Sequence, residues 1–267
     1  MLNADYRIDK QLIASSFAAA ANSYDAHAFL QRYVADALLG KMQASVGVSR
    51  VLDLGSGTGY CTQKLQDLYP NAEIISLDIA AAMLNYARQA HKSRQLSEVF
   101  ICADAENLPL QNQSIDVIFS SLAIQWCQNL SGLFAGLKQV LKPEGKLYLA
   151  TFGPGTLREL ELAWQQIDDA VHVNHFEDEM SIRQALQLNG FVSTRLQQQT
   201  EVRHYPTLAA LKNELKSIGA RNMNAGRVQG LNGRRKLQKL VRAFEKNAVA
   251  SRGIPVTYQV QFVSAQG

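Results

Sequence analysis

The sequence predicts an α/β fold built on an open, mostly parallel sheet of seven strands. Between residues 50 and 150, short β-branched or leucine-rich runs alternate with longer amphipathic ones. The first of these runs leads directly into three glycines at alternate positions, and acidic residues stand at the ends of the first three. Parallel strands joined by helices explain these observations, because their carboxyl ends meet at one edge of the sheet.

Residues 10–39 predict two helices, which form an amino-terminal extension over 1–48. Apolar residues such as Phe17, Leu30 and Val34 recur there at helical spacing in a stretch rich in Ala, Leu and Gln. The pattern is interrupted near 22–25, where we expect the two helices to separate.

The segment 49–153 predicts a cofactor-binding core in which each strand is followed by a helix. The turn at 142–145, Lys-Pro-Glu-Gly, should end the last helix of the core, because proline cannot continue a helix. The predicted strands of the core are 50–54, 73–77, 98–102, 115–120 and 145–152. The predicted helices of the core are 58–68, 80–90 and 130–141.

The remaining chain predicts two more strands and a helical lid, all within a single domain over 1–267. The lid is an insertion at 204–254, before the last strand, and its two helices are joined by a stretch rich in Gly and Asn at 219–233. The predicted strands are 191–203 and 256–263. The predicted helices are 156–171, 178–189, 208–218 and 234–250.

Composition excludes several classes of protein. No apolar run approaches the roughly 20 residues of a membrane helix, and the first residues lack the apolar block of a signal peptide, so we expect a cytoplasmic protein without a membrane partner. The net charge of +4 is too small to indicate a nucleic-acid partner. Cys61, Cys102 and Cys127 show no metal-binding spacing, so no metal site is predicted.

The turn after the first strand is the strongest sign of a ligand. Gly55, Gly57 and Gly59 allow unusual backbone conformations, and a helix amino terminus follows them. Their spacing is GxGxG, which differs from the dinucleotide pattern GxGxxG. Asp53, just before the glycines, offers a fixed carboxylate to a cationic ligand group, although a turn or capping aspartate is the alternative. Ser56 completes this predicted binding segment.

Carboxylates also follow the second and third strands. Asp78 stands about 20 to 25 positions beyond the glycines, where a carboxylate can hold both hydroxyls of a ribose. Asp104, at the end of the third strand, can accept the amino group of an adenine ring. Each aspartate alone could be an ordinary loop residue, but together they indicate a nucleoside site. The other predicted contacts are Ile79, Met83, Ala105, Glu106 and Leu122.

Four segments resemble successive motifs of the class I S-adenosylmethionine-dependent methyltransferases: VLDLGSGTG, SLDIAAAML, ADAENLPL and LKPEGKLYLATFGPG. The resemblance implies a Rossmann-like fold with S-adenosylmethionine as cofactor, and Asp53 near its methionyl ammonium. More narrowly, the chain resembles the malonyl-acyl-carrier-protein O-methyltransferases of biotin synthesis. That resemblance is carried by FAAAANSYDAHAFLQR, SSLAIQWCQNLS, TFGPGTLREL, LKSIGARNMNAGR and IPVTYQV.

The narrower resemblance implies methyl transfer to the free carboxylate of a malonyl thioester on acyl carrier protein. The methyl ester would prime pimeloyl synthesis for biotin. It also implies catalytic roles for Lys216 and Arg227, which would hold the carboxylate. Tyr24 is a third predicted catalytic residue, which would either close over the methyl site or hydrogen-bond the substrate. A basic run that could dock the acidic carrier consists of Arg234, Arg235, Lys236, Lys239 and Arg242.

Three alternatives remain open at this point. A class I methyltransferase for another small molecule, such as a quinone precursor, would share the cofactor motifs and favour a larger apolar pocket without a carboxylate clamp. A non-catalytic cofactor-binding module would share them as well. A nucleic-acid methyltransferase is disfavoured, because 120–123 lacks an Asn/Asp-Pro-Pro-aromatic motif.

Overall fold

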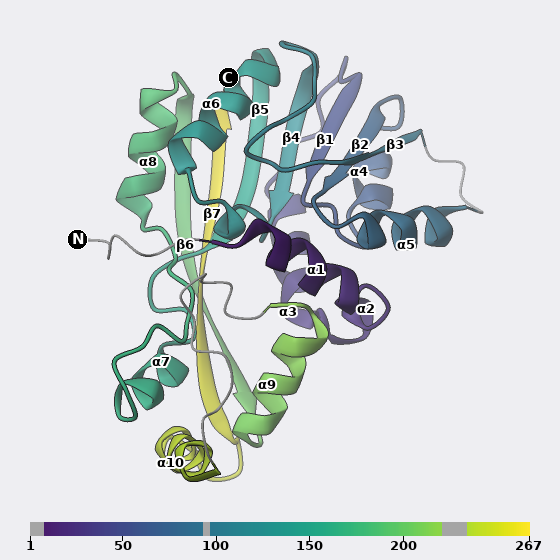
Figure 1. Cartoon of the computed structure of the whole chain (residues 1–267). Helices are drawn as coiled ribbons and strands as arrows, with labels where there is room; N and C mark the ends of the chain where they lie inside the picture. Colours follow the sequence, from purple (N-terminus) through teal and green to yellow (C-terminus); the bar gives the residue numbers. More distant parts are fainter. Residues whose placement is uncertain (1–7, 93–96, 221–233) are drawn as a thin grey trace.

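The computed structural model describes residues 8–92, 97–220 and 234–267, and the seven described strands form one sheet in the order β3-β2-β1-β4-β5-β7-β6 (Figure 1). Neighbours among β1 to β5 are parallel, whereas β7 is antiparallel to both β5 and β6. The mostly parallel seven-stranded sheet is therefore confirmed. The strands are β1 (Arg50–Leu54), β2 (Glu73–Asp78), β3 (Glu98–Cys102), β4 (Ile115–Ser121), β5 (Leu141–Phe152), β6 (Val192–Tyr205) and β7 (Ile254–Gln266).

Helices cover both faces of this sheet. On one face, α3, α4, α7, α9 and α10 share a core with strand residues such as Val51 and Phe119. On the other face, α6 and α8 share a core with Leu52 and Ile118. Successive strand residues thus serve opposite cores, as strand geometry requires. The bounds are α3 (Phe29–Leu39), α4 (Thr62–Leu68), α5 (Ala81–His91), α6 (Leu130–Val140), α7 (Arg158–Gln165), α8 (Glu179–Leu188), α9 (Leu208–Ser217) and α10 (Arg234–Glu245).

The amino-terminal segment forms α1 (Lys10–Ala20) and α3, and the one-turn helix α2 (Tyr24–His27) lies at the predicted break. Asp9 begins α1 by accepting a hydrogen bond from the amide of Leu12 at 3.0 Å. In Figure 1, α1 and α2 lie beside the carboxyl ends of β1 and β4. This arrangement places them over the turn that follows β1.

Several predicted elements have different bounds in the structure, and three of them show a local cause. The helix predicted at 58–68 begins at Thr62, because Gly57 and Gly59 have positive φ and keep the preceding segment in turns. The turn predicted at 142–145 lies within β5, where Glu144 has a φ of 64° and the pairing with β4 is irregular. The helix predicted at 156–171 ends at Gln165, followed by a turn in which Asp168 accepts a hydrogen bond from the amide of Ala170.

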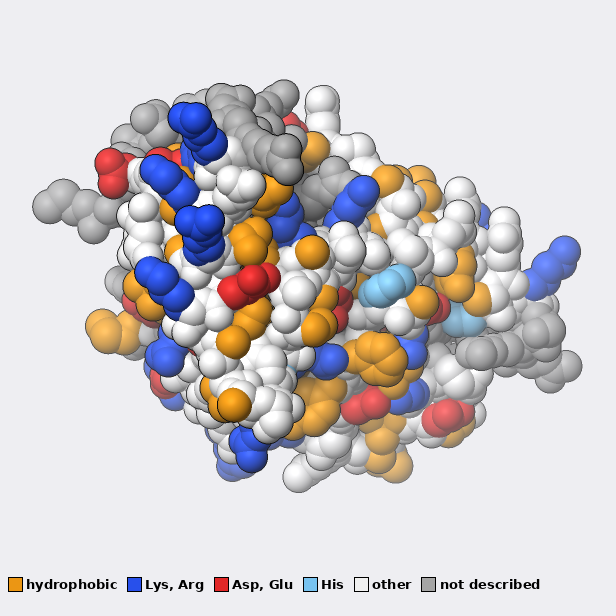
Figure 2. Space-filling view, turned by 90° about the horizontal axis from the view of Figure 1, so that it is seen from below, with side chains coloured by type: hydrophobic (Ala, Val, Ile, Leu, Met, Phe, Trp, Pro, Cys, Tyr) orange, Lys and Arg blue, Asp and Glu red, His pale blue; other side chains and the backbone are white. Residues whose placement is uncertain are grey.

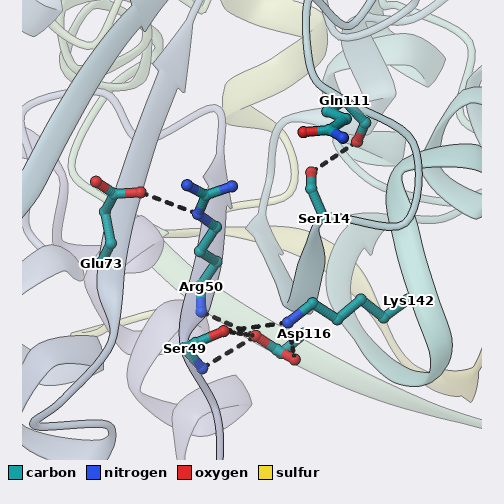
Figure 3. A network of polar contacts seen from close by, with 7 residues as sticks. All are labelled: Ser49, Arg50, Glu73, Gln111, Ser114, Asp116 and Lys142. Atoms are coloured by element: carbon teal, nitrogen blue, oxygen red, sulfur yellow. Dashed lines mark hydrogen bonds and ion pairs between the residues drawn. The ribbon is translucent and has the colours of Figure 1, made fainter.

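A polar network at the amino ends of the strands fixes the edge opposite the glycine turn (Figure 3). Oδ2 of Asp116 accepts hydrogen bonds from the amides of Ser49 and Arg50 at 3.0 and 2.9 Å, and its Oδ1 accepts one from Lys142 Nζ at 2.7 Å. Partial burial acts to raise the pKa of Asp116, but these partners outweigh it and hold the pKa below its usual value. The network joins β1, β4 and β5 at one edge, while the opposite edge carries the glycine turn.

The insertion predicted at 204–254 contains α9 and α10, which lie between β6 and β7 in the sequence. Its predicted linker at 219–233 falls mostly outside the described residues, and the domain boundaries stay predictions. None of the described helices is long and apolar enough to cross a membrane.

Candidate functional site

The chain turns sharply at the carboxyl end of β1. Gly55 and Gly57 have φ values of 74° and 56°, and the amides of Gly55 and Ser56 donate to the carbonyl of Leu77 at 2.7 and 3.1 Å. A Cβ on Gly55 would lie 2.3 Å from the Cβ of Ala123, whereas one on Gly57 would meet no atom within 4 Å. Packing therefore requires glycine at position 55, and the open space beside Gly57 is available to a ligand.

Asp78 ends β2 beside this turn. Its Oδ2 accepts a hydrogen bond from the amide of Gly57 at 3.0 Å, and its Oδ1 accepts one from the amide of Ala80 at 2.8 Å. Burial raises the pKa of Asp78 above its usual value, although these hydrogen bonds act in the opposite direction. Each oxygen keeps a further lone pair, so the carboxylate can accept both hydroxyls of a ribose.

Asp53 is a buried carboxylate with an unused hydrogen-bonding atom. Its side chain is 2% exposed, and its Oδ2 is buried without a hydrogen-bond partner among the described residues. Burial, followed by the nearby Glu98 and Asp78, raises the pKa of Asp53 to about 8. Leaving such an oxygen unpaired is unfavourable, so the site fits a ligand that brings a cationic donor.

Two adjoining cavities lie around the glycine turn and share Tyr24, Gly55, Gly57 and Ser121 in their walls. We call the first of them the nucleoside cavity. Predicted residues in its wall besides these are Asp78, Ile79, Met83, Asp104, Ala105 and Leu122. We call the other the amino-acid cavity, and its wall includes the predicted Asp53 and Ser56.

Charges of both signs line the amino-acid cavity. Arg32 forms an ion pair with Asp25 at 3.8 Å, and its Nε is buried without a partner among the described residues. Thr58 Oγ1 donates to Asp25 at 2.7 Å. A zwitterionic ligand would find Asp53 for its ammonium and Arg32 for its carboxylate. Asp25 and Arg32 both stand in the segment FAAAANSYDAHAFLQR that carries the family resemblance, but neither was predicted as a site residue.

Lys10 closes the nucleoside cavity from α1. Its Nζ donates to Asp104 Oδ1 at 2.9 Å and forms an ion pair with Glu106. Burial acts to lower the pKa of Lys10, but Cys127 and the two carboxylates outweigh it and raise the pKa above its usual value. Glu106 also accepts hydrogen bonds from the backbone of 128 and 129 and lies outside the cavity wall. Sequence reasoning missed Lys10, because its pairing with Asp104 spans 94 residues.

Gly59 and Tyr24 were also predicted site residues, and they differ from each other in whether they line a cavity. Gly59 has a φ of 80°, and a Cβ there would lie 2.5 Å from Cε1 of His91. It lines neither cavity, so its small size serves packing. Tyr24 lines both cavities, and burial, followed by the nearby Asp78 and Asp25, raises the pKa of its hydroxyl.

A third cavity, which we call the apolar chamber, adjoins the other two. It shares Trp126 with the nucleoside cavity and Gln31 with the amino-acid cavity. Phe152, Phe176 and Tyr258 give it an aromatic wall, and α3, α7 and α9 contribute further residues. No Lys or Arg is among the described residues that line it. Trp126 also contacts Phe17 of α1 edge to face, with ring centroids 5.5 Å apart.

Lys216 and Arg227, the two residues predicted to hold the acceptor's carboxylate, are not brought together in the described structure. Lys216 is exposed on α9 and lines none of the three cavities, while Arg227 lies outside the described residues. Their catalytic roles stay predictions. Among the described residues, no group of three or more His, Cys, Asp or Glu could hold a metal ion. His172, in the wall of the apolar chamber, pairs with Asp168 at 2.6 Å and stacks on Trp164.

Solved structures with the same fold include methyltransferases. The Haemonchus contortus phosphoethanolamine N-methyltransferase 2, in complex with S-adenosyl-L-methionine, is 18% identical with a TM-score of 0.56, covering 92% of this chain and 56% of that one. YcgJ from Bacillus subtilis is 15% identical with a TM-score of 0.60, covering 88% and 98%. These similarities establish the Rossmann-like class I methyltransferase fold, which the sequence predicted.

Sequence comparison narrows the family. Residues 52–149 match the model of a methyltransferase domain. The biotin biosynthesis bifunctional protein BioHC of Cellvibrio japonicus is 44% identical over 96% of this chain, which spans 50% of that protein's length. The malonyl-[acyl-carrier protein] O-methyltransferase of Methylococcus capsulatus is 38% identical over 94% of this chain and 92% of its own length. The chain therefore belongs to the malonyl-[acyl-carrier protein] O-methyltransferase family, as its motifs predicted.

Proposed function

We propose that this protein transfers a methyl group from S-adenosylmethionine to the free carboxylate of a malonyl thioester carried on acyl carrier protein. The methyl ester then primes pimeloyl synthesis for biotin. One observation carries the proposal: the apolar chamber meets both the nucleoside and the amino-acid cavities, at Trp126 and Gln31. An acceptor in that chamber would lie against the proposed cofactor site.

The described residues fit S-adenosylmethionine along its whole length. Asp78 would hold the ribose hydroxyls, and Ile79 and Met83 would pack on the adenine. Asp53 would take the methionyl ammonium, with its unpartnered Oδ2 as the accepting atom, and Arg32 would take the methionyl carboxylate. When bound, the cofactor supplies a methyl group attached to a positively charged sulfur.

The acceptor needs no general base. A carboxylate is ionised at neutral pH and is already the nucleophile. The residues of the chamber therefore act by holding the acceptor in line and by excluding water, which strengthens the attraction between opposite charges. Trp126, Phe152 and Phe176 supply the apolar wall for this purpose.

A basic face beside the chamber supports an acidic protein partner. Arg235, Lys239, Arg242 and Lys246, which we call the basic stripe, are exposed and recur at helical spacing along α10 and its end. None of them forms an ion pair with a described carboxylate, whereas Lys236 pairs with Asp168. Figure 2 shows Lys and Arg side chains in a row on this end of the molecule.

Since α10 packs on α7, whose Leu160 lines the chamber, a carrier docked on the basic stripe would hold its acyl group near the cavity. Electrostatic complementarity of this kind chiefly speeds association. A cytoplasmic location and the absence of nucleic-acid and membrane partners stay parts of the same proposal.

One observation favours a methyltransferase for another small molecule, such as a quinone precursor. The described wall of the apolar chamber contains no Lys or Arg, which is the feature expected for a neutral acceptor. The family relationship favours the malonyl thioester. The two readings differ in the chemical product, so an assay of the product separates them.

The test is to incubate the protein with methyl-labelled S-adenosylmethionine and malonyl-acyl carrier protein, then to measure label in the carrier fraction and its release as methanol by mild base. We expect base-labile label, because an ester forms. Unmalonylated carrier protein is the control. Cofactor binding without label on the malonyl carrier would reject the proposed acceptor and leave a methyltransferase for another molecule or a non-catalytic module.

A further inference from the structure

We propose that the apolar chamber receives the acyl end of the acceptor thioester and that Gln31 is the residue that orients its free carboxylate. The inference rests on the proposed function and adds a binding site and a specificity residue to it. Three features of Gln31 support it: its position between two cavities, its unsatisfied side chain and the charge of its surroundings.

Gln31 lies on α3 where the amino-acid cavity and the apolar chamber meet. The wall of the amino-acid cavity also includes Asp53 and Gly57, which stand at the carboxyl end of β1. The wall of the apolar chamber includes the three aromatic residues described above. A group bound to Gln31 would therefore touch the methyl-donor side and the acceptor side together, as a reacting carboxylate must.

The side chain of Gln31 has an unused hydrogen-bonding atom. Gln31 is half-buried, and its Oε1 is buried without a partner among the described residues, which is unusual for a buried polar atom. Other polar residues in the chamber wall have partners. Gln125 donates to the carbonyl of Leu122 at 2.7 Å, Thr156 accepts from the amide of Gln259 at 2.9 Å, and Asn174 has a partner as well.

Tyr258 and Glu214, which lie in the same wall, both pair with Tyr205. Tyr205 donates to Glu214 at 2.8 Å, and its hydroxyl lies 3.2 Å from that of Tyr258. Glu214 would repel a second carboxylate near it, since like charges in an apolar cavity interact strongly. These pairings leave Gln31 as a group in the described wall that is suited to meet the acceptor's carboxylate.

A neutral amide suits this chemistry. The oxygen and nitrogen of a glutamine amide exchange places by a simple rotation, so the buried end can present its N–H groups to a carboxylate oxygen. A hydrogen bond to a charged acceptor is stronger than one between neutral groups. Because the donor carries no charge, the carboxylate keeps the negative charge that makes it a nucleophile. Gln31 would thus orient the acceptor without neutralising it.

The experiment compares Gln31→Leu and Gln31→Glu with the wild-type full-length protein, using malonyl-acyl carrier protein at saturating S-adenosylmethionine. Loss of a hydrogen bond to a charged group predicts a roughly 10- to 100-fold lower kcat/KM for Gln31→Leu. Gln31→Glu should lose more, because it adds a like charge of similar shape. Gln184→Leu, an exposed helical glutamine of α8, is the matched control and should equal the wild type.

Cofactor affinity, measured by calorimetry on the same variants, shows whether Gln31 contacts the acceptor or the cofactor. It also shows that the variants are folded. We expect it to stay within about twofold of the wild type, because the proposed contact is with the acceptor. An unchanged kcat/KM in Gln31→Leu would overturn the inference. So would a parallel loss of cofactor affinity, which would assign Gln31 to the cofactor. Failure of the proposed function is a separate result, since the wild-type protein itself would then leave the malonyl carrier unlabelled.

Discussion

Replacing Asp53 by asparagine tests the proposed contact with the cofactor's ammonium. The carboxylate is 2% exposed, and its Oδ2 has no partner in the described structure, so a bound ammonium would satisfy it directly or through water. A hydrogen bond to a charged group contributes about 1.5–3 kcal/mol. Since about 1.4 kcal/mol corresponds to a tenfold change in Kd, Asp53→Asn should weaken cofactor binding by about 10- to 150-fold.

The same substitution should not destabilise the protein without cofactor. The pKa of Asp53 is raised to about 8, so above its usual pKa the folded state binds the proton more tightly than the unfolded state. The free energy of unfolding therefore falls as pH rises from about 4 to about 8. Asparagine removes this buried charge, so near pH 8 the Tm of the variant should equal or exceed that of the wild type.

Calorimetric titration with the cofactor between about pH 6 and pH 8.5 measures the first effect, and thermal unfolding without cofactor measures the second. Wild-type affinity should rise with pH as Asp53 ionises, and the curve of the variant should be flatter. The variant also controls for titration of the ligand's own amine. Binding at wild-type affinity, or a markedly lower Tm near pH 8, would refute the reasoning.

Three further predictions use the same assays. Gly57→Ala should weaken cofactor binding by about tenfold or more and lower the free energy of unfolding by about 1–2 kcal/mol. Gly59→Ala should lose more stability and less cofactor affinity. Equal effects of the two substitutions would contradict the placement of Gly57 inside the cavity wall and Gly59 outside it. Lys10→Met should weaken cofactor binding several-fold with Lys10→Arg partly restoring it, and an unchanged Kd would remove Lys10 from the site. Reversing all four charges of the basic stripe should raise KM for malonyl-acyl carrier protein by about tenfold at low salt and less at high salt, with malonyl-coenzyme A unaffected. The double variant Lys92→Glu and Arg195→Glu is the control, and a similar rise there would indicate a general charge effect.

The parts of the site that follow the strands could be predicted from the sequence because they depend on local order. A strand, a glycine turn and a helix place Gly55 and Gly57 at the carboxyl edge, and the parallel arrangement of β1, β2 and β3 brings Asp53, Asp78 and Asp104 to the same edge. Each of these positions is set within a few residues of a strand end.

The parts that could not be predicted depend on contacts between distant segments. Lys10 reaches Asp104 only because α1 lies beside the carboxyl ends of the strands, and Gln31 meets the amino-acid cavity only because α3 packs on β4 and β5. Gly59 carried the pattern of a ligand-binding glycine, yet its nearest constraint is His91 of α5. Spacing alone does not distinguish a glycine required by packing from one required by a ligand.

The distribution of charge explains how one fold can bind a charged cofactor and still react with a charged acceptor. Charged residues of both signs line the two cofactor cavities, and in the amino-acid cavity Arg32 and Asp53 match a zwitterion. The described wall of the apolar chamber offers Glu214, already paired with Tyr205, and no Lys or Arg. A carboxylate entering the chamber would therefore meet no Lys or Arg of the described wall, and the sulfonium of a bound cofactor would be the positive charge that attracts it. Attraction toward the methyl group, more than a fixed cation, would then draw the acceptor into line, and transfer would remove both charges at once.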